Sequence, residues 1–223
     1  MRVAVCVAED LRKQLSESAF NTVVDALKQG HATVFPTDTV AGLGVSVLHA
    51  GKPDEIFRIK RRRSDKPVAW LVDGPQALHE YGCDLPEGVE ALARAYWPGP
   101  LTIIVRAGKR VPTAFQSETG TIGMRMPDNE TALCLIEAVG SPLATSSANV
   151  SGLDAPDVPQ HVSMEVREAV GAILEDETHP SGRASTVLDC SGATPCILRE
   201  GAVSAADIHV FMPQVHADNA NTL

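Results

Sequence analysis

Aromatic residues are scarce in this sequence, and the features of several common protein classes are missing. Phe, Trp and Tyr make up only 4 % of its 223 residues. Because proteins that bind single-stranded nucleic acid stack bases on aromatic rings, this scarcity argues against a base-stacking platform. The formal net charge of −9 argues against broad, non-specific nucleic-acid binding, which needs many Lys and Arg side chains.

The five cysteines form no recognisable pattern. Their number is odd, no C-x-x-C motif occurs, and no Cys and His set has zinc-ligand spacing. We therefore expect no disulfide framework and no structural zinc, and we expect Cys6 and Cys190 to fill core volume. The first apolar run is too short for a signal peptide, and no apolar stretch is long enough to span a bilayer. These absences predict a cytoplasmic protein without a membrane segment.

Segments with helical and strand-like patterns alternate along the chain, and some strands follow one another directly. This order predicts a single α/β domain with a twisted, open, mixed sheet flanked by helices. The pattern fades after Asp207, so we expect a domain over 1–207 and a flexible tail over 208–223. Helices are predicted at 11–29, 53–62, 87–97, 129–139 and 162–170, and strands at 3–7, 32–35, 68–72, 101–105, 121–126, 143–145, 172–174, 185–189 and 196–198.

Residues 142–152, PLATSSANVSG, are unusually rich in small polar side chains. Five hydrogen-bonding side chains occupy seven positions, whereas a helix cap needs only one or two. In small-molecule sites, a few hydroxyls and amides orient the ligand within an otherwise apolar wall. The segment therefore indicates a ligand site.

Residues 60–66, KRRRSDK, hold five of the nineteen Lys and Arg residues. One or two cations would suffice to complement a helix carboxyl end. Five crowded like charges favour a polyanion partner, and both a triphosphate and RNA qualify.

Two further segments are ambiguous. In FPTDTVAGLG (35–44), Gly42 and Gly44 would let the backbone approach a bound group, or they belong to an ordinary turn. In TIGMRMP (121–127), Arg125 lies within a predicted strand, either on the solvent face or in a cleft that receives a carboxylate or phosphate. No Walker A motif and no G-x-S-x-G motif occurs.

Taken in order, seven runs resemble the YrdC-type family of threonylcarbamoyl-adenylate synthases. They are FPTDTVAGLG, IFRIKRRRSDKPVAWLV, YWPGPLTIIV, TIGMRMPDN, PLATSSANVSG, STVLDCSG and ILREG, and they span about residues 30–203. The resemblance implies an α/β sheet with a large, concave, cationic cavity. It also implies a nucleotidyltransferase that makes threonylcarbamoyl-AMP and pyrophosphate from L-threonine, bicarbonate or CO₂, and ATP. A partner complex would then transfer the threonylcarbamoyl group to tRNA, and direct tRNA contact is left open.

The resemblance also implies roles for individual residues. Lys60 and Arg62 would be catalytic and grip phosphate, with Ser64 and Lys66 supporting them. Mg²⁺ would accompany ATP, since no carboxylate cluster indicates a dedicated metal site. Threonine would be bound by Thr37, Arg125, Thr145 and Ser185, with Arg125 taking its carboxylate, and the nucleotide would also contact Ser147, Asn149 and Arg199.

Three positions depart from the family pattern. Ala41 replaces a usual aromatic residue, Arg63 replaces a commoner proline, and Ala155 stands where many relatives have serine. These changes leave room for a paralogue with altered substrate or reduced activity. A non-catalytic nucleotide-binding or RNA-binding paralogue on the same scaffold is the alternative hypothesis. A carbamoyl-transfer relative, as in hydrogenase-maturation enzymes, is a third hypothesis, which the short chain disfavours. The larger relatives carry a further carboxyl-terminal domain, so we expect this chain to correspond to the catalytic domain alone.

Overall fold

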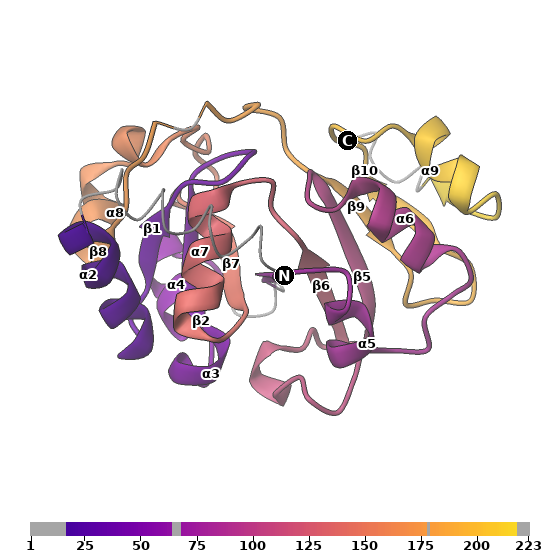
Figure 1. Cartoon of the computed structure of the whole chain (residues 1–223), viewed down its shortest axis with the longest axis horizontal. Coiled ribbons are helices and arrows are strands. Elements are labelled where there is room, and N and C mark those ends of the chain that lie inside the picture. Colours follow the sequence, from indigo (N-terminus) through magenta and orange to yellow (C-terminus); the bar gives the residue numbers. More distant parts are fainter. Residues whose placement is uncertain (1–16, 64–67, 178, 218–223) are drawn as a thin grey trace.

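One mixed sheet runs through the molecule (Figure 1). The computed structural model describes residues 17–63, 68–177 and 179–217. The strand order is β11-β10-β9-β5-β6-β3-β7-β2-β1-β8, and β4 pairs with β5. The β1–β8, β3–β6, β5–β9 and β10–β11 pairs are parallel, and the other pairs are antiparallel. The predicted open, mixed α/β sheet is therefore confirmed.

The elements have the following bounds. The strands are β1 (Thr33–Phe35), β2 (Gly42–Ser46), β3 (Ala69–Leu71), β4 (Gly82–Cys83), β5 (Leu101–Ala107), β6 (Thr121–Arg125), β7 (Leu143–Ser147), β8 (Ala172–Ile173), β9 (Thr186–Asp189), β10 (Cys196–Arg199) and β11 (His216–Ala217). The helices are α2 (Glu17–Lys28), α3 (Val47–Ala50), α4 (Asp54–Lys60), α5 (Ala77–Tyr81), α6 (Val89–Tyr96), α7 (Glu130–Val139), α8 (Met164–Ala169) and α9 (Ala205–Phe211), with short 3-10 turns at Thr113–Phe115 and Pro159–His161.

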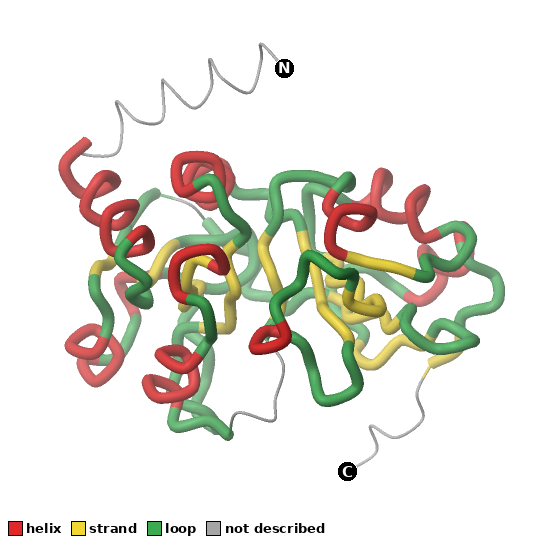
Figure 2. Tube along the Cα trace, turned by 90° about the horizontal axis from the view of Figure 1, so that it is seen from below, coloured by secondary structure: helices red, strands yellow, loops and turns green. Residues whose placement is uncertain are grey.

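The helices gather around the two ends of the sheet (Figures 1 and 2). At one end, α2 and α7 bury Phe20, Val23, Leu27 and Leu135 in a shared apolar cluster. At the other end, α6 and α9 pack together, with the rings of Tyr96 and Phe211 edge to face at a centroid distance of 6.0 Å. In the described ranges, no helix combines the length and the apolar character needed to cross a membrane.

The carboxyl-terminal boundary differs from the prediction. Helix α9 crosses the expected end of the domain at Asp207, and β11 pairs in parallel with β10. The helix begins with a capping box in which Ser204 and Asp207 satisfy each other's backbone N–H groups, and Ile208 and Met212 are fully buried. Residues 208–217 thus belong to the fold, and 218–223 lie outside the described residues.

The amino-terminal predictions are described only in part. The predicted helix 11–29 corresponds to α2 from Glu17 onward. The predicted strand 3–7, with Cys6, lies outside the described residues. The core position predicted for Cys190 is confirmed, because only 2 % of that residue is exposed.

The glycines of FPTDTVAGLG lie in a strand rather than in a turn. Gly42 and Gly44 belong to β2, which pairs antiparallel with β1. A Cβ atom added to either glycine would lie 2.9 Å from the ring of Phe35. Both residues therefore make room for that ring, although Gly42 also borders the cavity described below.

Candidate functional site

A cavity of about 480 Å³ opens against the middle strands of the sheet. Ala69 on β3 lies between Gly123 on β6 and Thr145 on β7 in the strand register. Because these three neighbouring residues are small, they leave the face of the sheet hollow. Seven of the predicted site residues line this cavity, namely Thr37, Arg62, Arg125, Thr145, Ser147, Ser185 and Arg199.

Of the other four predicted site residues, two lie behind the cavity and two are not described by the structure. Lys60 and Asn149 lie directly behind the wall formed by the end of β7, as their hydrogen bonds show. Ser64 and Lys66 lie outside the described residues. The two alanines that depart from the family pattern, Ala41 and Ala155, do line the cavity. The Ala41 amide donates to the Pro156 carbonyl at 2.9 Å, which brings their two segments together.

Arg125 is buried in the cavity rather than on the solvent face. Its Nη1 donates to both carboxylate oxygens of Asp38, at 3.0 and 3.1 Å. Burial lowers the pKa of the Arg125 guanidinium, Asp38 raises it, and the nearby charge of Arg199 lowers it further. Its Nε and Nη2 donate to no residue in the described part of the chain. One edge of the guanidinium is therefore fixed, and the other can take a carboxylate.

Lys60 joins the end of α4 to the TSSAN segment. Its Nζ donates to the Ser147 carbonyl, to the Asn149 carbonyl at 2.8 Å and to Asn149 Oδ1 at 3.0 Å. Burial and, to a smaller extent, the charge of Arg62 lower the pKa of Lys60 to about 8. The ammonium thus holds the cavity wall from behind instead of projecting into the cavity.

The Asn149 side chain completes this wall. Besides the bond from Lys60, its Oδ1 accepts from Ser147 Oγ at 2.5 Å. Its amide nitrogen donates to the Leu153 carbonyl at 2.6 Å and to the Val150 carbonyl at 3.1 Å. Because both ends of the amide are engaged, the loop after β7 has one defined conformation.

Arg62 reaches the same wall from the cavity side. Its Nη1 donates to Ser146 Oγ at 3.3 Å. The neighbouring Arg61 points elsewhere and forms an ion pair with Glu165 at 2.5 Å. The side chains of residues 60–62 therefore contact three different parts of the structure, and they do not form one continuous cationic surface.

The hydroxyl groups around the cavity are largely ordered by the protein itself. Thr37 Oγ1 donates to the Val40 carbonyl at 2.7 Å and accepts from the Thr39 amide at 3.2 Å, which fixes the turn after β1. Across the cavity, Ser185 Oγ lies 2.9 Å from Thr102 Oγ1. Arg199 donates from Nε and Nη2 to the Ser185 carbonyl at 3.1 and 2.9 Å.

Sequence reasoning missed Asp38 and Thr102. Both lie inside runs that carry the family resemblance, but a single sequence does not show that Asp38 pairs with Arg125 or that Thr102 pairs with Ser185. These contacts join residues 87 and 83 positions apart. The one signal that the sequence offered for Asp38 and Thr102 was that each is a polar residue inside a run that carries the family resemblance.

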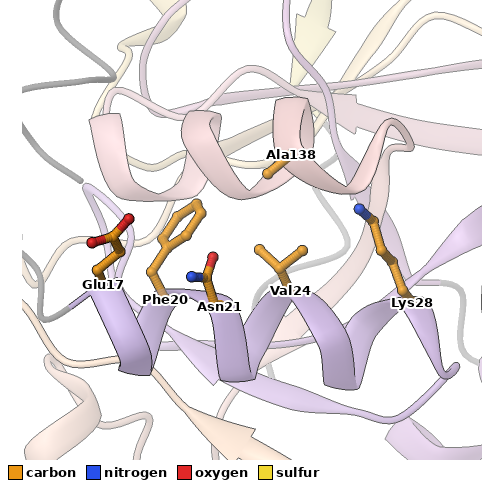
Figure 3. Close-up of a pocket in the computed structure, with 6 residues that line it drawn as sticks. All are labelled: Glu17, Phe20, Asn21, Val24, Lys28 and Ala138. Carbon is orange, nitrogen blue, oxygen red and sulfur yellow. The ribbon is translucent and has the colours of Figure 1, made fainter.

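A second, smaller hollow of about 350 Å³ lies between α2 and α7 (Figure 3). Phe20 and Val24 on α2 face Ala138 on α7 and give the hollow apolar walls, and Glu17 and Lys28 stand at opposite ends of α2. The two charges are of opposite sign and do not converge. The sheet cavity, with three guanidinium groups and several hydroxyls, is the better candidate for a reaction site.

Comparison with known proteins identifies relatives of this chain. Threonylcarbamoyl-AMP synthase from Pyrococcus abyssi is 31 % identical over 206 residues, covering 92 % of this chain and 61 % of that protein. A putative threonylcarbamoyl-AMP synthase from Mycobacterium leprae is 36 % identical over 203 residues, covering 91 % of this chain and 90 % of that protein. This chain thus spans about three fifths of the length of the Pyrococcus protein.

Two solved structures have the same fold. The crystal structure of P. abyssi Sua5 in complex with L-threonine superposes with a TM-score of 0.83 at 31 % identity, over 89 % of this chain and 58 % of that one. The crystal structure of E. coli YciO superposes with a TM-score of 0.75 at 26 % identity, over 85 % of this chain and 92 % of that one. The Sua5, YciO and YrdC family model, described as telomere recombination, matches residues 25–201. The chain therefore belongs to the Sua5/YciO/YrdC family.

Proposed function

We propose that this protein is an L-threonylcarbamoyladenylate synthase. It would convert L-threonine, bicarbonate or CO₂, and ATP into threonylcarbamoyl-AMP and pyrophosphate. The observation that carries the proposal is the set of three guanidinium groups, from Arg62, Arg125 and Arg199, around one cavity lined with hydroxyls. Such a cavity suits a ligand with several anionic groups, and the names of the relatives indicate which ligand that is.

The amino-acid end of the substrate is assigned to Arg125. Asp38 holds Nη1, so the Nε and Nη2 edge remains for the two oxygens of the threonine carboxylate. Thr37, Thr145 and Ser185 supply hydroxyls on the same cavity. A pocket that hydrogen-bonds a substrate hydroxyl rejects analogues that lack it.

The nucleotide end is assigned to Arg62, Arg199 and the Ser147 side of the wall. Lys60 would act through this wall, by fixing Ser147 and Asn149 and by adding positive potential near the phosphates. Mg²⁺ would enter with ATP, bound mainly by phosphate oxygens and water. Across 17–63, 68–177 and 179–217, no three carboxylate, His or Cys side chains are grouped to hold a metal.

The proposed chemistry needs no protein nucleophile. The unprotonated threonine amine adds to CO₂, and the resulting carbamate releases one proton to solvent. A carbamate oxygen then attacks the α-phosphorus, the bond from that phosphorus to the bridging oxygen breaks, and pyrophosphate leaves. Charge builds up on the phosphate oxygens during this step, where positioned guanidinium groups stabilise it most.

The test is threonine-dependent pyrophosphate release by the purified protein with ATP and bicarbonate. We expect release only when all three substrates are present, and we expect Arg125→Met to lose this threonine-dependent release. A folded wild-type protein that releases no pyrophosphate would reject the proposal.

The alternative of a non-catalytic RNA-binding paralogue predicts a different result, namely tRNA binding that weakens steeply with salt. The arrangement of Lys60, Arg61 and Arg62 disfavours this alternative, because the three side chains point to separate parts of the structure and form no continuous cationic surface for RNA. Transfer of the product to tRNA by a partner complex is implied by the family resemblance and belongs to the proposed function.

A further inference from the structure

Two chain segments cross at unusually close range beside the cavity. The residues after β10 pass over the start of β9, where Ala184 and Ser185 lead into Thr186. A Cβ atom on Gly201 would lie 2.3 Å from the Ala184 carbonyl oxygen and 2.5 Å from the Thr186 nitrogen. Only a residue without a side chain allows this approach.

The hydroxyl of Thr186 holds the crossing together. Its Oγ1 donates to the Val203 carbonyl at 2.6 Å and accepts from the Gly201 amide at 2.8 Å and the Val203 amide at 3.1 Å. The residue is fully buried and does not line the cavity. One side chain thus supplies three hydrogen bonds between the two segments.

The crossing fixes one wall of the cavity. Ser185 directly precedes Thr186, and Arg199 lies two residues before Gly201. Arg199 donates to the Ser185 carbonyl from Nε and Nη2 and to Ser185 Oγ from Nη2 at 3.3 Å. Both residues line the cavity, so the geometry of this wall depends on how the two segments are held.

The charge of Arg199 has no counterion among the described residues. Arg199 is close enough to Arg125 for its charge to lower the pKa of that guanidinium. Asp38 compensates one of the two positive charges through its ion pair with Arg125. Arg199 forms no ion pair with a described carboxylate, so an anionic ligand in the cavity would supply its countercharge.

We infer that Thr186 is a positioning residue that holds Ser185 and Arg199 in place, and thereby preorganises the wall for an anionic ligand. The inference rests on the proposed function only for the identity of that ligand, a nucleoside triphosphate. Preorganisation raises affinity because the cost of ordering the wall is met during folding rather than during binding.

A merely structural role for Thr186 predicts something different. A buried threonine with three hydrogen bonds stabilises any fold, and its loss would lower the unfolding free energy without changing the affinity of the remaining folded protein. The two roles are therefore separated by measuring affinity under conditions where each variant is fully folded.

The experiment compares three variants of the full chain. Thr186→Val removes the hydroxyl and keeps the branched shape, and Thr186→Ser keeps the hydroxyl. Thr33→Val is the matched control, because Thr33 is equally buried and its hydroxyl has no hydrogen-bond partner among the described residues. Calorimetry measures binding of ATP and of pyrophosphate, and pyrophosphate release gives KM and kcat.

We expect Thr186→Val to weaken ATP and pyrophosphate binding about tenfold, as for the loss of one good hydrogen bond, and to raise KM more than it lowers kcat. Thr186→Ser should regain most of the affinity, and Thr33→Val should match the wild type. Unchanged affinity in folded Thr186→Val would overturn the inference, as would a serine variant no better than the valine variant.

Two further outcomes keep the proposals separate. If the wild type binds ATP but releases no pyrophosphate, the synthase proposal fails while the calorimetric comparison still tests Thr186. If the wild type binds neither ATP nor pyrophosphate, the wall is no such anion site and the inference is wrong. Should Thr186→Val fail to fold, amide hydrogen exchange on the wild type decides: the Gly201 and Val203 amides should already exchange slowly without a ligand, and fast exchange that slows only when pyrophosphate is added would contradict the inference.

Discussion

Replacing Lys60 by Met tests whether a buried ammonium supports the cavity wall. The substitution keeps most of the apolar stem and removes the donors to the Ser147 carbonyl, the Asn149 carbonyl and Asn149 Oδ1. A hydrogen bond from a charged donor contributes about 1.5–3 kcal/mol. Part of the stability lost with these hydrogen bonds is offset, because the variant no longer buries a charged group at a cost in free energy. We expect a net loss of about 3 kcal/mol of unfolding free energy.

Urea unfolding measures this loss, and Lys52→Met is the matched control. Lys52 is largely exposed and pairs with Asp54 at the surface, so the same substitution there should change stability by less than about 0.5 kcal/mol. In assays well below the unfolding midpoint, Lys60→Met should also bind ATP more weakly, because the Ser147 wall is no longer fixed. If Lys60→Met is as stable as Lys52→Met, the ammonium does not hold the loop and the reasoning is wrong.

Four other predictions follow from described contacts. Burial lowers the pKa of Lys60 from 10.5 to about 8, so between these pH values the unfolded state binds more protons than the folded state. The unfolding free energy should therefore rise with pH from about 8 to 10.5, and Lys60→Met should lack this rise. Thr33→Val removes a buried hydroxyl without a hydrogen-bond partner in the described ranges, and urea unfolding should show a gain of about 1 kcal/mol. Gly123→Leu should abolish ATP binding while Gly123→Ala retains it, since a Cβ atom there lies 3.5 Å from its nearest neighbours but a longer side chain would fill the cavity. Ser204→Ala should cost about 1 kcal/mol by removing the cap of α9.

Local patterns predicted the elements of the fold that have a strong period. Helix α7 lies at the predicted residues because Asn129 caps it by accepting from the Ala132 amide and Gly140 ends it in a left-handed conformation. The strand alternation around Arg125 correctly limited that residue to two faces, but choosing the buried face required knowledge of the neighbouring strands. The short elements β4 and β11 contain two residues each and have no period to detect.

The seven runs that carry the family resemblance predicted which residues meet at the cavity better than they predicted what each residue does. Arg125 and Arg199 reach the cavity, as expected. Asp38 and Thr186 act on these arginines through contacts between distant segments, and a single sequence contains no record of such pairs. The same limit applies to the tail, where burial of Ile208 and Met212 depends on α6 rather than on the local pattern.

The cationic run shows why charge density alone gave an incomplete interpretation. Five cations in seven positions indicated one polyanion surface, yet α4 ends at Lys60 and Arg61 adopts a left-handed conformation with φ of 49°. This reversal sends Lys60 inward to the Ser147 and Asn149 carbonyls, Arg61 outward to Glu165, and Arg62 to the cavity. A left-handed conformation costs a non-glycine residue about 1–2 kcal/mol, so the packing of the side chains on either side must outweigh that cost. The end of the helix, rather than the number of charges, therefore decides which cation reaches the cavity.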